Sequence, residues 1–183
     1  MKNRNQSQNN LFRLVFAGVT GAMVCIATSV FVIPLPTGGY VNLGDCFVMI
    51  AGYLLGAVYG AFAGGIGSAL ADLFLGYSIY APFTFIIKAL MATVVYWIFK
   101  FATGHLEKVR FLAMIIATLC AEAIMISGYF LLEICFYGLE GAVANLLGNA
   151  VQGLFGCVST VIFYSFLSKT KLSDKLTNIL CSR

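Results

Sequence analysis

Apolar runs alternate with short polar segments along the whole chain. A helix needs about 20 apolar residues to cross the hydrocarbon core of a bilayer, and six of the runs have roughly that length. The predicted helices cover residues 12–33, 43–59, 61–76, 82–101, 110–134 and 141–168. All three prolines fall at the edges of these runs, where a missing backbone N–H costs little. The pattern therefore predicts an all-α membrane protein, a bundle of six transmembrane helices that forms one domain over residues 1–183.

The composition supports lipid as the solvent. Hydrophobic residues make up 61% of the 183-residue chain and charged residues 10%, whereas soluble domains carry about 25% charged residues. A soluble fold of this length could not bury so much apolar surface. The net charge of +4 comes from the short polar stretches between and beside the runs, so no nucleic-acid-binding surface is expected.

The basic residues indicate how the chain lies in the membrane. Ten of the eleven Lys and Arg residues occupy three stretches, at residues 2–13, 100–110 and 169–183. With six crossings, all three stretches lie on one side, and the predicted loops on the other side contain no Lys or Arg. Because cytoplasmic loops carry an excess of Lys and Arg, both termini are predicted to be cytoplasmic.

The eleventh cation, Lys88, lies alone inside an apolar run, where a charge needs a partner or a cavity. Polar groups from other runs fall at a similar predicted depth, in the half of the bundle away from the termini. Asn145, Asn149 and Gln152 have the spacing i, i+4, i+7 and share one helical face. We expect the polar groups to line one binding site, whose candidate residues are Tyr40, Asn42, Asp45, Lys88, Tyr129, Glu133, Asn145, Asn149 and Gln152.

A purely structural interpretation stays open for several of these groups. Asp72 and Lys88 have opposite charges and similar predicted depths, so they are predicted to form a neutral structural pair, and whether Lys88 also contacts a ligand is left open. Glu133 is equally compatible with an exposed outer position. The three amides of the last run supply donors and acceptors together, which suits a neutral polar heterocycle. The lack of an arginine pair disfavours phosphorylated ligands.

Five segments carry a family resemblance: Pro36-Thr-Gly-Gly-Tyr-Val-Asn-Leu-Gly-Asp45, Gly67-Ser-Ala-Leu-Ala-Asp-Leu-Phe-Leu-Gly-Tyr77, Ala81-Pro-Phe-Thr-Phe-Ile-Ile-Lys88, Gly128-Tyr-Phe-Leu-Leu-Glu133 and Asn145-x-x-x-Asn149-x-x-Gln152-Gly153. Together they resemble the substrate-binding S components of energy-coupling factor (ECF) vitamin transporters. The likeness covers nearly the whole chain and is greatest to the group of predicted hydroxymethylpyrimidine and pyridoxine carriers. The Asn-Leu-Gly-Asp motif with six spans is fairly specific for the family and poorly specific for the vitamin.

The resemblance implies an outward-facing pocket for a small heteroaromatic vitamin or precursor, covered by the first loop. It implies that Ala17, Gly21 and Ala22 contact a transmembrane coupling subunit, driven by two cytoplasmic ATPases in the cell membrane of a prokaryote. The chain itself has no G-x-x-x-x-G-K-[ST] motif. It is therefore not expected to be an enzyme or to bind a cofactor or metal, and ATP would be used by the partner subunits.

Other functions stay open. An S component for riboflavin or for a queuosine precursor would share these motifs. A self-sufficient secondary transporter of a small metabolite is an alternative, although no matching pair of interrupted helices is evident. An intramembrane enzyme is disfavoured because the one histidine, His105, lies in the predicted cytoplasmic connection. The polar cluster argues against a structural protein without a ligand.

Overall fold

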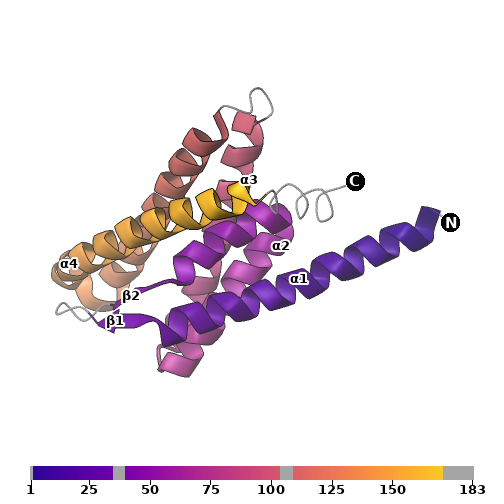
Figure 1. Cartoon of the computed structure of the whole chain (residues 1–183). Helices are drawn as coiled ribbons and strands as arrows, with labels where there is room; N and C mark the ends of the chain where they lie inside the picture. Colours follow the sequence, from indigo (N-terminus) through magenta and orange to yellow (C-terminus); the bar gives the residue numbers. More distant parts are fainter. Residues whose placement is uncertain (1, 35–39, 104–108, 171–183) are drawn as a thin grey trace.

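A computed structural model describes residues 2–34, 40–103 and 109–170 of the chain. The elements in chain order are α1 (Lys2–Val30), β1 (Val32–Pro34), β2 (Tyr40–Asn42), α2 (Gly44–Leu75), α3 (Ala81–Thr103) and α4 (Arg110–Lys169) (Figure 1). Figure 1 shows the strands and the turn of α4 close together, away from the N-terminus of α1. The described part of the chain is thus almost entirely helical, as the apolar pattern predicts.

The helix α2 turns back on itself at Gly56. This glycine has φ 85° and ψ 178°, a backbone conformation that lies outside the helical region and is open to glycine alone. Beyond the turn, Gly60 packs against Ala51, and a Cβ at Gly60 would lie 2.7 Å from the Ala51 carbonyl oxygen. Gly64 packs in the same way against Val48. The two halves of α2 therefore run antiparallel, and small residues allow their close approach.

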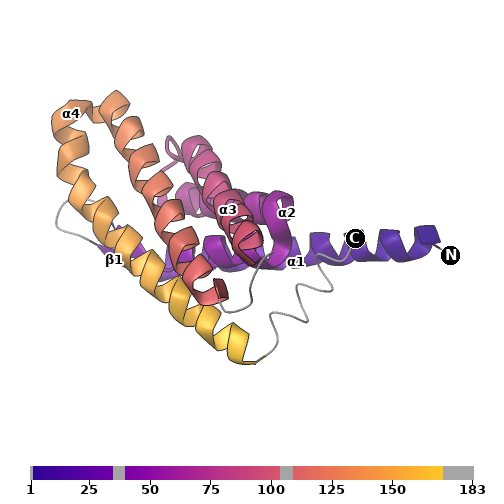
Figure 2. The ribbon, with the colours of Figure 1, turned by 90° about the horizontal axis from the view of Figure 1, so that it is seen from above.

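The helix α4 has the same design on a larger scale. Its 60 residues would form a rod of about 90 Å if they were straight, about three times the hydrocarbon thickness of a bilayer. At Gly138 the backbone leaves the helical region, with φ 74° and ψ 178°. Figure 2 shows the second half of α4 returning along the first. Gly153 consequently packs against Glu122, which precedes the turn.

The described residues form four long helices where the sequence pattern predicted six. By length and composition, the four helices that could cross a membrane are Asn10–Val30, Gly44–Leu75, Ala81–Ala102 and Arg110–Lys169. The count differs because two predicted connections, the break at residue 60 and the loop over residues 135–140, are absent. A single glycine, Gly56 in α2 and Gly138 in α4, turns the chain instead. The turn of α2 lies at Gly56, four residues earlier than predicted.

A short antiparallel ribbon replaces the end of the helix predicted over residues 12–33 and part of the predicted first loop. Strand β1 pairs with β2 in a register that places Val32 opposite Asn42 and Pro34 opposite Tyr40. The ribbon connects the end of α1 to the start of α2. It matters for the site because Asn42, the last residue of β2, is buried.

The core lies where α2, α3 and α4 meet. Four methionines are fully buried there: Met49, Met91, Met114 and Met125. Their flexible side chains fill irregular space between helices. Gly52 of α2 lies against α3, where a Cβ would collide with the Ala92 carbonyl oxygen. The cavity described below adjoins this core, since Met125 belongs to both.

Candidate substrate-binding site

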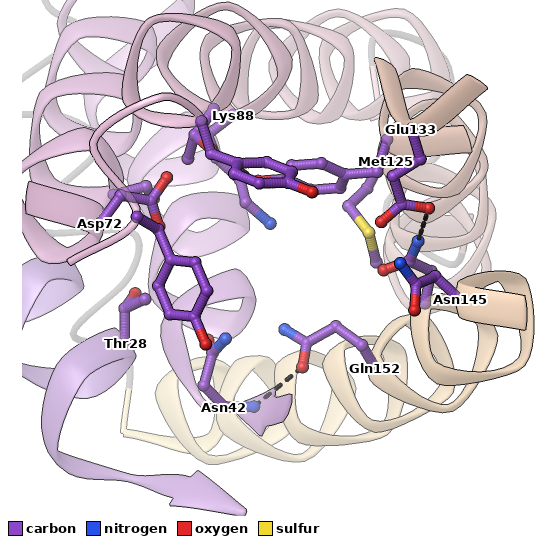
Figure 3. Close-up of a pocket in the computed structure, with 14 residues that line it drawn as sticks. Thr28, Asn42, Asp72, Lys88, Met125, Glu133, Asn145 and Gln152 are labelled. Carbon is purple, nitrogen blue, oxygen red and sulfur yellow. Dashed lines mark hydrogen bonds between the residues drawn. The ribbon is translucent and has the colours of Figure 1, made fainter. Parts of the chain in front are cut away.

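A cavity of about 130 Å³ lies between the helices, next to the ribbon and the turn of α4 (Figure 3). Every helix and strand β2 contribute to its walls. The lining residues are Thr28, Asn42, Ser68, Asp72, Tyr77, Tyr80, Thr84, Lys88, Met125, Tyr129, Glu133, Asn145, Asn149 and Gln152. Most of these side chains carry a hydrogen-bonding group, which is unusual for a cavity among apolar helices and marks it as a candidate ligand site.

Lys88 of α3 forms an ion pair with Asp45 of α2, and both side chains are buried. The Lys88 ammonium also lies 5.6 Å from the centre of the Tyr129 ring, within range of a cation–π contact. The predicted structural pair of Lys88 with Asp72 is therefore corrected: the ion pair is made with Asp45. Both carboxylates have a similar depth, and the helix hairpin of α2 brings Asp45, the earlier of the two, to the ammonium.

Gln152 connects this ion pair to the ribbon. Its Nε2 donates a 2.8 Å hydrogen bond to Asp45 Oδ2, and its Oε1 accepts a 2.8 Å hydrogen bond from the Asn42 backbone N–H. The Asn42 side chain in turn accepts a 2.7 Å hydrogen bond from the backbone N–H of Gly44, at the start of α2. Both ends of the Gln152 amide are therefore held by the protein, and Gln152 positions β2 against α4.

The polar groups on the wall formed by α4 and α3 are held less firmly by hydrogen bonds within the protein than Gln152 is. Asn149 Nδ2 donates to Glu133 Oε2 at 3.4 Å, a long hydrogen bond. Thr84 and Tyr129 share a hydrogen bond of 3.0 Å between their hydroxyl oxygens. Figure 3 shows Glu133 and Asn145 across the cavity from Asp72. Polar groups on opposite walls can thus reach the two sides of one small molecule.

Aromatic side chains form the rim of the cavity near the helix turns. The Tyr80 hydroxyl donates to the Tyr137 hydroxyl at 3.1 Å, which links the α2–α3 connection to the turn of α4. The ring of Phe136 packs edge-on against Tyr80, with centroids 5.6 Å apart. Burial and the hydrogen bond to Tyr137 raise the pKa of the Tyr80 phenol above its ordinary value. This phenol therefore stays protonated and keeps its donor.

The structure brings most of the predicted site residues together. Those that line the cavity are Asn42, Lys88, Tyr129, Glu133, Asn145, Asn149 and Gln152. Asp45 is not among the lining residues and acts through Lys88 and Gln152. The side chain of Tyr40 lies outside the part of the chain whose side chains are described.

Several lining residues were not predicted: Thr28, Ser68, Tyr77, Tyr80, Thr84 and Met125. Thr84 precedes Lys88 by four positions and Ser68 precedes Asp72 by four, so each shares a helical face with a residue that was singled out. That spacing could have identified both. Thr28 has no such signal, because its place depends on how α1 packs.

The small residues of α1 divide between two faces. Ala17 is buried in a cluster with Ala51 and Ala63 of α2. A Cβ at Gly21 would lie 3.3 Å from the Ala63 carbonyl oxygen, so Gly21 also faces α2. Ala22 is exposed. Of the three residues predicted to contact a coupling subunit, Ala17 and Gly21 pack against α2, and Ala22 is the exposed one. The contact itself stays a prediction.

The fold and the cavity define the class of protein: it is a helical membrane protein that encloses a small polar site. The chain belongs to the ECF-type riboflavin transporter S component family, whose model matches residues 8–169. It is similar to a protein of Pyrococcus woesei described as an uncharacterized protein in gap 3′ region, with 35% identity over 136 residues that cover 74% of this chain and 87% of the relative.

A second relative is the thiamine precursor transporter HmpT of Lactococcus lactis subsp. cremoris (strain MG1363). It is 26% identical over 163 residues, which cover 88% of this chain and 90% of the relative. Both the family and this relative are described as transporters, which agrees with the long apolar helices of the chain. The protein is a multi-pass membrane protein and a transporter subunit, rather than an enzyme, of a family that serves vitamin uptake.

Proposed function

We propose that the protein is the substrate-specific subunit of an ATP-driven importer for a vitamin or precursor with a single heteroaromatic ring, of the hydroxymethylpyrimidine or pyridoxine type. The volume of the cavity carries this proposal. Its roughly 130 Å³ is close to the ~150 Å³ of an engineered cavity that holds one benzene molecule. One six-membered ring with small substituents fits such a space.

The chemistry of the walls supports a neutral or cationic ligand. Lys88 is the one cation among the described lining residues, and its charge is already balanced by Asp45. Asp72 and Glu133 add carboxyl groups, and Asn145 and Asn149 add amides that both donate and accept. An anionic ligand would meet these carboxyl groups without a free cation, whereas an amino-substituted or hydroxylated ring would supply hydrogen-bond donors to them.

Riboflavin is the second candidate, because the matching family is described as riboflavin transporters. Its three fused rings and ribityl chain need a larger space than one ring does. A riboflavin carrier would have to open the cavity by moving the ribbon or the aromatic rim. The relative described as a thiamine precursor transporter favours the smaller ligand.

The protein would work with partners in the membrane. We propose that a transmembrane coupling subunit binds it and that two cytoplasmic ATPases supply the energy, as membership of the family implies. The two halves of α2 and the two halves of α4 would then form separate membrane segments, which makes six segments in the cell membrane of a prokaryote. The first half of α2, before Gly56, is about 18 Å long and shorter than the hydrocarbon core. Arg110 and Lys169 lie at the ends of α4 away from its turn, so the positive-inside rule would place these ends in the cytoplasm and the cavity outside.

The decisive experiment is mass spectrometry of ligand released from the purified protein, followed by binding titrations. Hydroxymethylpyrimidine, pyridoxine, riboflavin and a queuosine precursor would be compared on the wild type and on Asn149→Ala. We expect one single-ring compound to bind, and Asn149→Ala to weaken that binding. A folded protein that binds riboflavin more tightly than any single-ring compound would overturn the substrate proposal.

Transport assays separate the importer from a secondary transporter. The protein alone in liposomes is expected to bind substrate without accumulating it, and accumulation is expected when the coupling subunit, the ATPases and ATP are added. Accumulation by the lone protein, driven by an ion gradient, would show that it is a self-sufficient secondary transporter.

A further inference from the structure

Glu122 places a carboxyl group beneath the cavity, one helical turn from the lining residue Met125. Its side chain is 3% exposed, and neither carboxyl oxygen has a hydrogen-bond partner within the described part of the chain. An ionised carboxylate in such surroundings costs several kcal/mol unless a cation or hydrogen bonds compensate it. The charge state of Glu122 therefore depends on the charged and titratable groups around it.

The titratable neighbours come from three elements. Asp45 of α2 and Lys88 of α3 are the charged groups that act on Glu122. The thiols of Cys46 on α2 and Cys157 on the second half of α4 also lie within its electrostatic reach. The cluster thus contains two acids and one base, and the base is already paired with Asp45. With both acids ionised, one negative charge would remain buried without a counterion.

The second half of α4 leaves room for this carboxyl group. A Cβ at Gly156 would collide with Glu122 Oε1 and lie 3.2 Å from Asp45 Cβ, and a Cβ at Gly153 would lie 3.5 Å from Glu122 Oε2. The helix therefore presents its backbone to the acid, where an apolar side chain would otherwise cover it. The space is adapted to a polar head group.

A metal ion is a poor counterion at this point. Among the described residues, no three His, Cys, Asp or Glu side chains are grouped to hold a metal. Both oxygens of Asp45 are already engaged, one by Lys88 and one by Gln152. A metal ion would find one carboxylate only, whereas a proton needs no further ligand.

We propose that Glu122 is a proton-binding site beneath the substrate cavity and that its proton makes the cluster of Asp45, Lys88 and Glu122 electrically neutral. The proton also determines the partner of Lys88, because an ionised Glu122 would compete with Asp45 for the same ammonium. Asp45 holds Gln152, and Gln152 holds β2. Occupancy of the proton site therefore keeps the ribbon seated against the cavity.

Infrared spectroscopy tests the proposal without any ligand. The full chain would be reconstituted in lipid at neutral pH, and the carbonyl stretch of a protonated carboxyl group, which is separate from the carboxylate bands, would be recorded in H₂O and D₂O. We expect a band that shifts in D₂O, is lost in Glu122→Gln and persists in Glu140→Gln, an exposed control. Absence of the band in the wild type, or its survival in Glu122→Gln, would overturn the proposal.

A second preparation leaves Glu122 untouched in case its replacement prevents folding. In the triple variant Glu107→Gln, Glu133→Gln, Glu140→Gln, Glu122 is the remaining glutamate, and labelling with carboxyl-¹³C glutamate should shift the band. A band that does not respond to this label comes from an aspartate and contradicts the assignment. A band that disappears when sodium replaces choline would identify a cation site and likewise contradict it.

Discussion

Gln152 of α4 donates a 2.8 Å hydrogen bond to Asp45 of α2, although 107 positions separate the two residues in the sequence. The same aspartate pairs with Lys88, so three helical segments meet at one carboxylate. The other end of the Gln152 amide holds the ribbon. Asp45 therefore holds the site together without lining the cavity. Its replacement should lower the stability of the protein and should affect ligand recognition only through that loss.

We expect Asp45→Asn to lower the free energy of unfolding by about 3–5 kcal/mol, because it removes the carboxylate that is paired with the buried Lys88 ammonium. Chemical unfolding of the purified protein in detergent measures the loss. The double variant Asp45→Asn, Lys88→Met removes both charges and should recover much of the stability. A double variant as unstable as Asp45→Asn would show that the ion pair is not the cause.

Alanine substitutions of Asn149 and Gln152 on α4 are expected to have different effects on ligand binding and on stability. Asn149→Ala should weaken ligand binding by about 1–3 kcal/mol, because a hydrogen-bonding partner of the ligand is lost, and should leave the thermal unfolding temperature nearly unchanged. Gln152→Ala should lower both quantities, since it also releases Asp45 and the Asn42 backbone. Calorimetric titration and thermal unfolding of the same preparations measure them. Unchanged affinity in Asn149→Ala would assign Asn149 a structural role.

Much of the fold could be predicted because it depends on local composition. Apolar runs of bilayer length and the positions of the prolines identify where helices lie, although α1 begins at Lys2, ten residues before the predicted start, and ends at Val30, before the predicted end. The turn of α2 was misplaced because several glycines follow one another there, and only Gly56 has the positive φ that turns the chain. Spacing alone does not distinguish a glycine that turns from one that packs, such as Gly60.

The partners inside the site could not be predicted for a related reason. Depth along a helix identified the residues that share a layer, and most of them line one cavity. Depth does not specify which of two carboxylates, Asp45 or Asp72, meets Lys88, since that depends on how the helices rotate against one another. The double engagement of Gln152 by β2 and Asp45 likewise arises from packing between distant segments.

Gly156→Ala is expected to destabilise the protein by about 1–3 kcal/mol, because the added methyl group would collide with the Glu122 carboxyl group. Gly18→Ala is the matched control, since a Cβ at Gly18 meets nothing within 4 Å. The control should be neutral or slightly stabilising, as Gly to Ala exchanges in exposed helices are. Unfolding of both variants under the same conditions provides the comparison. Equal stability of the two would refute the close packing of Gly156 on Glu122.

Bulky substitutions on α1 distinguish its two faces. Ala17→Trp should lower stability, because Ala17 is buried against α2. Ala22→Trp should spare both folding and ligand binding and impair ATP-driven uptake if the exposed face contacts the coupling subunit. Binding to the isolated protein and uptake by the assembled transporter are measured in parallel. Full uptake with Ala22→Trp would exclude this face of α1 as the docking surface.

Cysteine labelling tests the orientation in the membrane. In a background without the native cysteines, a membrane-impermeant maleimide added to intact cells should label Glu140→Cys, beside the turn of α4. It should label Lys169→Cys only after the cells are permeabilised, because the basic end of α4 is expected in the cytoplasm. Ligand binding by each variant controls for its fold. Labelling of Lys169→Cys in intact cells would reverse the orientation and place the cavity on the cytoplasmic side, which is incompatible with capture of a vitamin from outside.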